Sequence, residues 1–284
     1  MSASQLLAPG ARRHPCFNPS ATERFGRIHL PVAPDCNIRC GYCDRRHDCV
    51  NESRPGVTSR ILDPERALAH LGESRARMPF LSVVGIAGPG DPLAEPKLTL
   101  ATLELVRRHH PDLLLCLSSN GLGLADEVEN LVDLGVDFVT LTINAVDPLI
   151  GSRIYDHIRL AGGICRGVEA AGALLQRQID AVVRLKDRGV TVKINTVVIP
   201  EINDREVLAV ARLTASLGAD LMNLIGMIPV AGTPLERHSP PSRSMLDTLR
   251  AKAAEYLPQM THCSRCRADA CGLIRDGADH SRAG

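Results

Sequence analysis

The feature that most constrains the fold is a regular alternation of short apolar runs and helical segments that begins near residue 29. Most of the apolar runs are nearly continuous in Val, Ile and Leu, which is typical of parallel strands covered on both faces. The predicted strands are His29–Pro34, Leu81–Ala87, Leu113–Ser118, Phe138–Asn144, Val190–Ile199 and Leu221–Ile228. The alternation therefore predicts an α/β fold of six successive β–α units.

The segments between these strands carry helix signals. One helix is predicted to begin at Pro64 with Asp63 as its N-cap, because a carboxylate there can accept a hydrogen bond from a free backbone N–H. Further helices are predicted at Leu98–His110, Ala125–Leu134, Arg166–Arg188, Arg205–Leu217 and Ser242–Tyr256. The segment 144–166 shows no clear period and is predicted to be a long loop.

We expect these units to form a partial or near-complete β/α barrel of the TIM type. An open doubly wound sheet is the alternative, but no G-x-G-x-x-G motif follows the first predicted strand. Residues 1–28 are rich in Pro, Ser and Arg and are expected to form an irregular arm. In β/α barrels the catalytic groups gather at the C-terminal ends of the strands. The site is therefore expected in the loops that follow the predicted strands.

Composition and charge exclude several classes of function. The 284 residues carry 33 basic and 32 acidic side chains, so no electrostatic attraction to nucleic acid or to an anionic membrane is expected. The sequence has no apolar run long enough to span a bilayer and no secretion signal at its N-terminus, so we expect a cytoplasmic protein. Ten cysteines in such a protein should be reduced thiols, which favours metal binding or catalysis over disulfides.

Cys36, Cys40 and Cys43 form a C-x3-C-x2-C motif directly after the first predicted strand. Three thiolates in one short loop can hold a cubane iron–sulfur cluster and leave its fourth iron without a protein ligand. Such an iron can bind a substrate or a cofactor in addition to carrying electrons. A zinc knuckle is the alternative, but zinc sites usually pair two C-x2-C units, and only one lies in this loop.

The other cysteines are less informative by spacing alone. Cys263 and Cys266 form a C-x2-C step beyond the last predicted helix, and this step fits a metal site and a reduced pair equally well. Cys116 lies within an apolar strand, where a free cysteine is usually a small buried hydrophobe. Cys16 lies in the arm, and Cys49 borders the three-cysteine loop. No role follows from position for Cys165 or Cys271. A single histidine such as His14, His29 or His47 is more often a solvated or core residue than a metal ligand.

Several strings together resemble the NifB family of radical S-adenosylmethionine (SAM) proteins. They are His14-Pro15-Cys16, His29–Pro34, the three-cysteine loop with Tyr42 before its last cysteine, Asp48–Val57, Gly85–Ala94, Ser118–Gly121, Thr142–Asn144 and Cys263–Ala270. The cysteine spacing alone is shared by the whole radical SAM superfamily, whereas Glu52–Val57 and Cys266–Ala270 are far more specific. The resemblance extends from about His14 to Gly272.

The resemblance implies an activity and a domain arrangement. The NifB family fuses two 4Fe–4S clusters, with a SAM-derived carbide and an extra sulfur, into the eight-iron precursor of the nitrogenase cofactor. It implies an N-terminal arm over 1–28, a radical SAM barrel over 29–257 and a cluster-binding tail over 258–284. The chain is expected to be a stand-alone form without a NifX-like domain, and an enzyme of lyase or transferase type that uses methyl transfer and hydrogen abstraction.

The resemblance also implies partners, and two other functions remain open. The implied partners are an electron-donating ferredoxin or flavodoxin and the cofactor carrier and scaffold proteins of the NifX and NifEN type. The first alternative is a radical SAM enzyme whose auxiliary clusters serve the modification of a peptide or small molecule. The second is a zinc-binding module without enzymatic activity.

Carried over residue by residue, the resemblance implies three 4Fe–4S clusters. Cys36, Cys40 and Cys43 would hold the SAM-binding cluster. The first accessory cluster would be held by Cys16, Cys49 and Cys116, with His29 as its nitrogen ligand and His14 as the alternative to His29. Cys263 and Cys266 would hold the second accessory cluster.

The remaining site residues are implied as contacts to SAM or as catalytic groups. Those for SAM are Gly88, Gly90 and Asp91 in a Gly-rich turn, together with Ser118, Asn120, Asn144, Asn195 and Met227. Glu52 is expected to accept a proton or to face a cluster, with Arg54 beside it. A salt bridge between Glu52 and Arg54 that stabilises the loop is an equally good interpretation.

Overall fold

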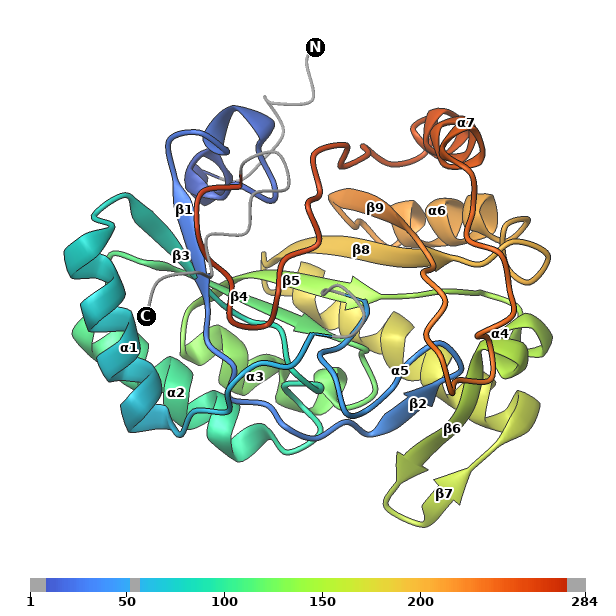
Figure 1. The fold of residues 1–284 in the computed structure, drawn as a ribbon, viewed down its shortest axis with the longest axis horizontal. Helices are drawn as coiled ribbons and strands as arrows, with labels where there is room; N and C mark the ends of the chain where they lie inside the picture. The colour runs from blue at the N-terminus through green and yellow to red at the C-terminus, as the bar shows by residue number, and fades with distance from the viewer. Residues whose placement is uncertain (1–8, 52–56, 275–284) are drawn as a thin grey trace.

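Six parallel strands form the centre of the molecule. The computed structural model describes residues 9–51 and 57–274. The strands are β1 (Gly26–His29), β3 (Leu81–Ile86), β4 (Leu114–Ser119), β5 (Val136–Thr142), β8 (Thr191–Val198) and β9 (Leu221–Gly226). They are hydrogen-bonded in that order, and β10 (Cys271–Gly272) pairs antiparallel with the outer edge of β1. Figure 1 shows the sheet as a curved row of strands, which forms a half-barrel.

Helices connect the strands and cover the sheet. They are α1 (Pro64–Arg77), α2 (Pro96–His109), α3 (Leu124–Asp133), α4 (Pro148–Ile154), α5 (Gly167–Asp187), α6 (Val207–Ser216) and α7 (Arg243–Ala253). The predicted cap of α1 is present, because the Asp63 side chain accepts a hydrogen bond from the Arg66 N–H at 2.8 Å. The predicted α/β class and the partial β/α barrel are therefore confirmed.

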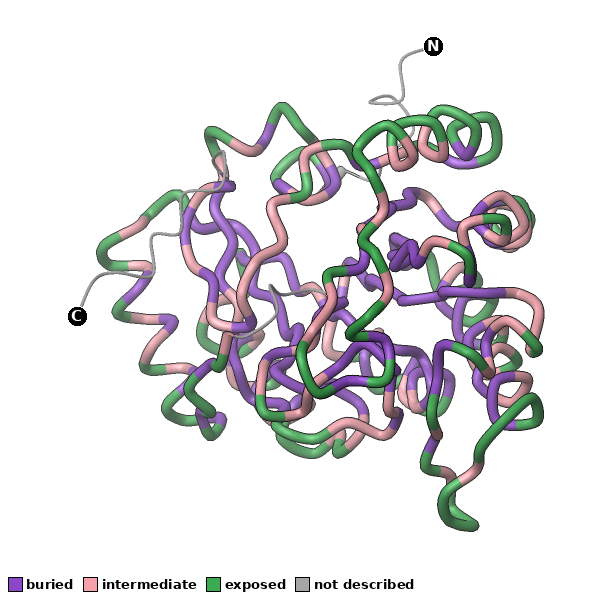
Figure 2. Tube along the Cα trace, turned by 45° about the vertical axis from the view of Figure 1, so that its right-hand side comes forward, coloured by how far each residue is buried: buried purple, intermediate pink, exposed green. Residues whose placement is uncertain are grey.

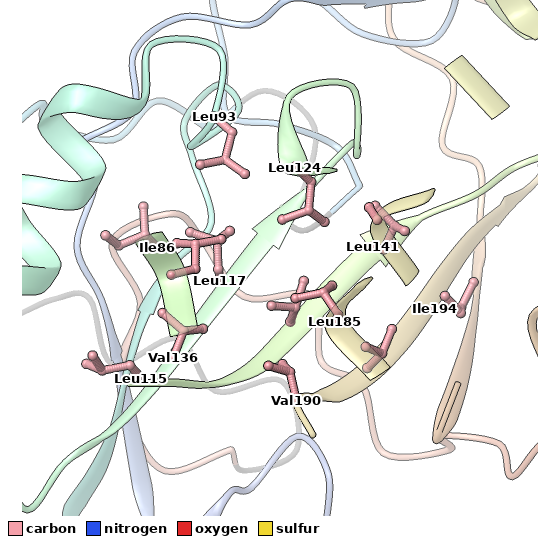
Figure 3. Close-up of a cluster of buried hydrophobic side chains, with 14 of the residues drawn as sticks. Ile86, Leu93, Leu115, Leu117, Leu124, Val136, Leu141, Leu185, Val190 and Ile194 are labelled. Carbon is pink, nitrogen blue, oxygen red and sulfur yellow. The ribbon is translucent and has the colours of Figure 1, made fainter. Parts of the chain in front are cut away.

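A hydrophobic layer fills the space between the strands and the helices. Leu115, Leu117 and Leu141 project from β4 and β5 and are fully buried. Figure 3 shows them beside Leu124 of α3 and Leu185 of α5. Replacing one such leucine with alanine typically costs about 2–5 kcal/mol. Every residue of β3 and β8 is buried, and Figure 2 shows continuous buried stretches of chain inside the molecule.

The N-terminal arm packs against the interior of the half-barrel. It contains two short 3-10 helices, η2 (Pro9–Arg13) and η3 (Pro19–Ala21). Between them, the Phe17 ring lies 4.8 Å from the ring of Phe138 on β5. An apolar cluster near the beginnings of the strands joins Ala11, Phe17, Val83, Leu114, Phe138, Leu221 and Met260. The arm therefore covers the interior at the N-terminal ends of the strands.

The C-terminal segment 258–272 connects the two edges of the half-barrel. Beside β9, Met222 donates a hydrogen bond to the Pro258 carbonyl at 2.8 Å and accepts one from Met260 at 2.7 Å. Beside β1, His29 donates to the Ala270 carbonyl at 2.8 Å, and β10 follows. Cys263 and Cys266 lie between these two attachments.

Two predicted elements differ in the structure. The first strand was predicted at 29–34 but lies at Gly26–His29, because Pro31 and Pro34 have no N–H to donate to a neighbouring strand. The domain boundary predicted after residue 28 falls inside this strand, and the domain division stays a prediction. The segment 144–166 is not a long loop, since it forms α4, β6 (Tyr155–Leu160) and β7 (Gly163–Cys165).

The strands β6 and β7 belong to a second, smaller sheet. The strand β2 (Ile38–Cys40) pairs antiparallel with β6, and β6 pairs with β7. Figure 1 shows the β6–β7 hairpin projecting from the body of the molecule. The sheet therefore anchors the middle of the three-cysteine loop, up to Cys40. No helix in the described part of the chain combines the length and apolar character needed to cross a bilayer.

Candidate functional site

A first cavity opens where the strands end. It has a volume of about 440 Å³, counting the part open to solvent, and Cys36, Cys40 and Cys43 all line it. Its other walls come from the loop after β3, with Gly90 and Asp91, and from the end of β4. This is the edge of the sheet at which β/α barrels place their reactive groups.

Tyr42 anchors the three-cysteine loop from the inside. Its side chain is 1% exposed, and its hydroxyl donates to Asn51 Oδ1 at 2.9 Å and accepts from Asn144 Nδ2 at 2.8 Å. On the backbone, Gly41 donates to the Ile154 carbonyl at 2.7 Å. The aromatic residue before the last cysteine therefore fixes the loop by hydrogen bonds as well as by packing.

Gly90 allows the loop after β3 to touch the three-cysteine loop. Its N–H donates to the Ala33 carbonyl and the Asp91 N–H donates to the Asp35 carbonyl, both at 2.6 Å. A Cβ atom at position 90 would lie 1.9 Å from the Asp35 carbonyl oxygen. Only glycine fits this approach, which sets the position of Cys36 relative to Asp91.

Asp91 is a buried carboxylate that organises the end of β4. It accepts hydrogen bonds from the Leu93 N–H at 2.9 Å, from the Asn120 N–H at 2.6 Å and from the Ser119 hydroxyl at 3.1 Å. Burial raises the pKa of Asp91, and these hydrogen bonds act in the opposite direction. Asn120 in turn donates from its side chain to Asn37 Oδ1 at 2.8 Å, so Asp91 also orients a contact to the three-cysteine loop.

The thiols of the first cavity are protonated in the metal-free protein. Loss of water contact on burial raises the pKa of Cys36 to about 12 and also raises the pKa of Cys40 and Cys43. Iron would have to displace these protons, because the thiolate is the ligand. Three soft thiolates around one cavity fit an iron–sulfur cluster, whose irons are held by cysteine thiolates.

The described residues contain no group of three His, Cys, Asp or Glu side chains close enough to share one metal ion.

A second cavity lies inside the half-barrel, next to the first. It has a volume of about 640 Å³, again counting the part open to solvent. Five of the predicted ligands line it: Cys16, His29, Cys116, Cys263 and Cys266. They come from the arm, β1, β4 and the C-terminal segment. Asn51, Ala87 and Ser118 line both cavities, so the two spaces share a wall.

Two buried cations face the second cavity. Arg27 of β1 is 7% exposed, and its guanidinium donates to Cys266 Sγ at 3.0 Å and to the Gly272 carbonyl at 2.7 Å. Lys193 of β8 is 5% exposed, and its ammonium lies 5.4 Å from the centre of the Phe17 ring. Positive charges in a water-poor space attract anions strongly, so this cavity favours a negatively charged occupant.

His29 has the geometry of a metal-binding histidine. Its Nδ1 lies 3.0 Å from the Arg267 carbonyl oxygen, which can only accept, so Nδ1 carries the proton and Nε2 keeps its lone pair. Metal-bound histidines usually donate their other N–H to a carbonyl or carboxylate in this way. Burial lowers the pKa of His29 to about 4, which keeps the ring neutral. Gly85 leaves room for the ring, since a Cβ there would lie 2.9 Å from His29 Cδ2.

The structure places the predicted SAM contacts in different surroundings. Gly90, Asp91, Ser118 and Asn120 line the first cavity together with the three cysteines. The others are not among the residues that line it: Gly88 lies near Ala268, Asn144 supports Tyr42, Asn195 lines the second cavity, and Met227 is buried. All eight assignments stay predictions.

Some of the predicted metal ligands and catalytic residues also lie elsewhere. Cys49 lines the first cavity and is not among the residues that line the second. Glu52 and Arg54 lie outside the described residues. Cys165 in β7 and Cys271 in β10 line neither cavity. The three-cluster arrangement therefore stays a prediction, and Cys49 is the predicted ligand whose position fits it least.

Several polar residues of the second cavity were not predicted from the sequence. Arg27, Lys193 and Asn223 line it, and all three lie in strands. The sequence does carry a signal for them, which is the spacing of polar residues within the strands, because residues two apart face the same side of a sheet. Arg27 is two residues from His29, and Lys193 is two residues from Asn195. These polar pairs interrupt apolar strands and mark the face that points into the barrel.

Comparison with known proteins identifies the family. The Radical SAM superfamily matches residues 30–214. The chain belongs to the radical SAM superfamily. Among solved structures, SuiB of Streptococcus suis bound to S-adenosylmethionine has a TM-score of 0.60 at 15% identity, covering 83% of this chain and 50% of that one. The hydrogenase maturase HydG of Carboxydothermus hydrogenoformans gives 0.59 at 16% identity, covering 82% and 52%. These two likenesses show the fold alone.

Among curated proteins, the chain is homologous to FeMo cofactor biosynthesis proteins NifB. It is 49% identical to that of Chlorobaculum tepidum over 263 residues, which cover 93% of this chain and 62% of the relative. It is 48% identical to that of Klebsiella pneumoniae, covering 98% and 60%, and 42% identical to that of Azotobacter vinelandii, covering 93% and 53%. The chain thus spans between half and two thirds of the length of these relatives, and the resemblance predicted from the sequence is confirmed.

Proposed function

We propose that this chain is a radical SAM enzyme that builds the precursor of the nitrogenase cofactor. In this reaction two 4Fe–4S clusters are fused, with a SAM-derived carbide and one extra sulfur, into an eight-iron product. The homology to NifB proteins supports this role. The observation that carries the proposal is the second cavity, which is lined by four cysteines and two histidines and shares a wall with the three-cysteine cavity.

The first cavity would hold the resident cluster and SAM. When bound, a 4Fe–4S cluster on Cys36, Cys40 and Cys43 supplies the electron for reductive cleavage of SAM. Asp91 holds the backbone of Asn120 and the Ser119 hydroxyl in place at the rim. Tyr42 closes the inner side of the loop and keeps water from the buried thiols. Gly90, Ser118 and Asn120, which line this cavity, would contact SAM.

The second cavity would hold the two clusters that serve as substrate. Cys16, Cys116 and His29 would bind one, together with Cys49, which lines the first cavity, and Cys263 and Cys266 would bind the other. Incomplete cysteine ligation suits a cluster that must later be released. Arg27 and Lys193 would balance the negative charge of these substrates. Glu52 is proposed to accept a proton during the reaction, with Arg54 as its neighbour.

The test is an anaerobic assay with the purified chain, SAM, a reductant, iron and sulfide. We expect about twelve irons per chain from three four-iron clusters. We also expect a transferable product that activates cofactor-free nitrogenase, with a ferredoxin or flavodoxin as electron donor and NifX- or NifEN-type proteins as acceptors. A chain that cleaves SAM and modifies a peptide, but yields no transferable cluster, would contradict the proposal. Zinc in place of iron would contradict the enzyme class as well.

A further inference from the structure

The second cavity contains another histidine, His14, whose hydrogen bonding is opposite to that of His29. The backbone N–H of Cys16 donates to His14 Nδ1 at 3.1 Å. An N–H can only donate, so Nδ1 carries no proton and the ring proton resides on Nε2. His29 donates from Nδ1 to a carbonyl and keeps its lone pair on Nε2. One histidine therefore offers an N–H to the cavity and the other offers a lone pair.

Among residues 9–51 and 57–274, the His14 N–H has no hydrogen-bond partner. The side chain is 2% exposed, lines the second cavity, and its Nε2 makes no hydrogen bond. A buried N–H without an acceptor is unfavourable, and such groups in folded proteins usually have an explanation in a ligand or an ion. The missing acceptor is therefore expected on whatever occupies the cavity.

Packing holds the His14 ring in this orientation. The ring contacts Phe17 and Phe138 edge-on, with centroid distances of 4.7 and 4.6 Å. To bind iron through Nε2, the ring would have to carry its proton on Nδ1, where it would face the Cys16 N–H. Two donors would then oppose each other at 3.1 Å. The geometry thus disfavours His14 as an iron ligand, in contrast to His29.

We propose that His14 donates a hydrogen bond from Nε2 to a sulfide of the cluster that Cys16, Cys116 and His29 would hold in the second cavity. The inference rests on the proposed function, because it takes an iron–sulfur cluster as the occupant. His14 is a binding residue in this role and not an iron ligand. Its link to the Cys16 backbone couples the donor to a proposed thiolate ligand. Hydrogen bonds to cluster sulfurs stabilise the more negative, reduced state and so raise the reduction potential.

The test uses the full chain with Cys36, Cys40 and Cys43 replaced by alanine, so that the remaining cluster signals come from the second cavity. Two substitutions separate the two halves of the His14 ring. His14→Asn keeps an acceptor near the Cys16 N–H but removes the donor to the cavity. His14→Gln places an amide donor near the Nε2 position but loses the Cys16 contact. His29→Ala serves as the comparison for loss of a nitrogen ligand.

The measurements are the midpoint potential, followed by paramagnetic resonance, and the nitrogen coupling in pulsed spectra. We expect His14→Asn to shift the potential to a more negative value and His14→Gln to restore most of the shift. Both should keep the nitrogen coupling, which His29→Ala should abolish. An unchanged potential in His14→Asn, or loss of its nitrogen coupling, would overturn the inference while the proposed function stands. If the parent variant binds no iron in the second cavity, the inference and the proposed function both fail.

Discussion

The two cavities hold cysteines in different ways. In the first, three thiols come from one loop, Cys36 to Cys43, which is fixed by Tyr42 from within and by the loop around Gly90. In the second, the cysteines and His29 come from four segments that are spread over nearly the whole chain. The first cavity is a local structure that the barrel supports. The second exists only when the arm, the sheet and the C-terminal segment are assembled, so distant substitutions should affect it more.

The largest effect is expected at the first cavity. Cys40→Ala removes one of the three thiolates that would hold the SAM-binding cluster, so reductive cleavage of SAM should fall to background. Iron bound in the second cavity should remain, because none of its lining residues changes. Production of 5′-deoxyadenosine and iron content per chain measure the two effects. Cys165→Ala, in the β6–β7 hairpin, is the control and should retain both. Loss of all iron in Cys40→Ala would show that the cavities are not independent.

A double substitution tests the second cavity in the same manner. Cys263→Ala with Cys266→Ala should leave reductive SAM cleavage intact but stop methyl transfer and precursor formation, since one substrate cluster loses its thiolates. Labelled SAM and transfer of the product to cofactor-free nitrogenase provide the measurements. Cys271→Ala is the matched control in the same segment, outside both cavities. If the double variant still forms the precursor, the assignment of this cysteine pair is wrong.

Gly90→Ala tests how the first cavity is held, because it alters the contact between the loop after β3 and the three-cysteine loop. The added Cβ would meet the Asp35 carbonyl at 1.9 Å, so the loop must move. We expect a loss of about 3 kcal/mol in the free energy of unfolding, at the upper end of overpacking effects, together with weakened SAM binding. At Gly72 in α1, an added methyl group would meet no atom within 4 Å apart from its chain neighbours and the adjoining backbone of the helix, so Gly72→Ala should stabilise by about 1 kcal/mol. Denaturant unfolding of the metal-free chain measures both, and equal stabilities would contradict the steric argument.

The smallest effect is expected at Asp48. This residue follows the three-cysteine loop in the sequence and is hydrogen-bonded to the C-terminal segment 258–272. Its buried carboxylate accepts from Ser59 N–H at 2.9 Å, Ser59 Oγ at 2.6 Å and Ala268 N–H at 3.1 Å. Asp48→Asn turns one acceptor into a donor that faces another donor, at a cost of about 2 kcal/mol.

Hydrogen exchange should then increase at 258–272 more than in the three-cysteine loop. The exposed Asp126→Asn, whose partner is Arg177, should change stability by less than about 1 kcal/mol. If hydrogen exchange in Asp48→Asn increased equally in both regions, Asp48 would have no specific role in holding the segment 258–272.

The sequence predicted the barrel well, because its strands are buried on both faces and its helices have a strong period. Two local features were missed for physical reasons. Proline at positions 31 and 34 shifts the first strand toward the N-terminus, to Gly26–His29. The helix α4 and the strands β6 and β7 are too short to show a period, although Asp147 caps α4 by accepting from the Leu149 N–H at 2.8 Å.

The same distinction applies to the candidate sites. The three-cysteine loop was visible because its spacing is local. The second cavity joins residues as distant as Cys16 and Cys266, and no spacing rule connects them. Cys116 illustrates the difficulty. It lies in an apolar strand, so its sequence context favours a buried apolar residue, and only the family resemblance indicates a metal ligand. Arg27 and Lys193 face the interior of the half-barrel. They could have been predicted only if polar residues two positions apart in a strand had been taken to mark the face that lines a cavity.

The pairing of β10 with β1 has a consequence for how the protein is made. The first strand to leave the ribosome finds this edge partner only after Cys271 and Gly272 have emerged. The three-cysteine loop, by contrast, is supported by elements that are synthesised earlier. The wall that carries Cys263 and Cys266 therefore forms after the support of the three-cysteine loop, and the second cavity is enclosed only once Cys271 and Gly272 have been synthesised.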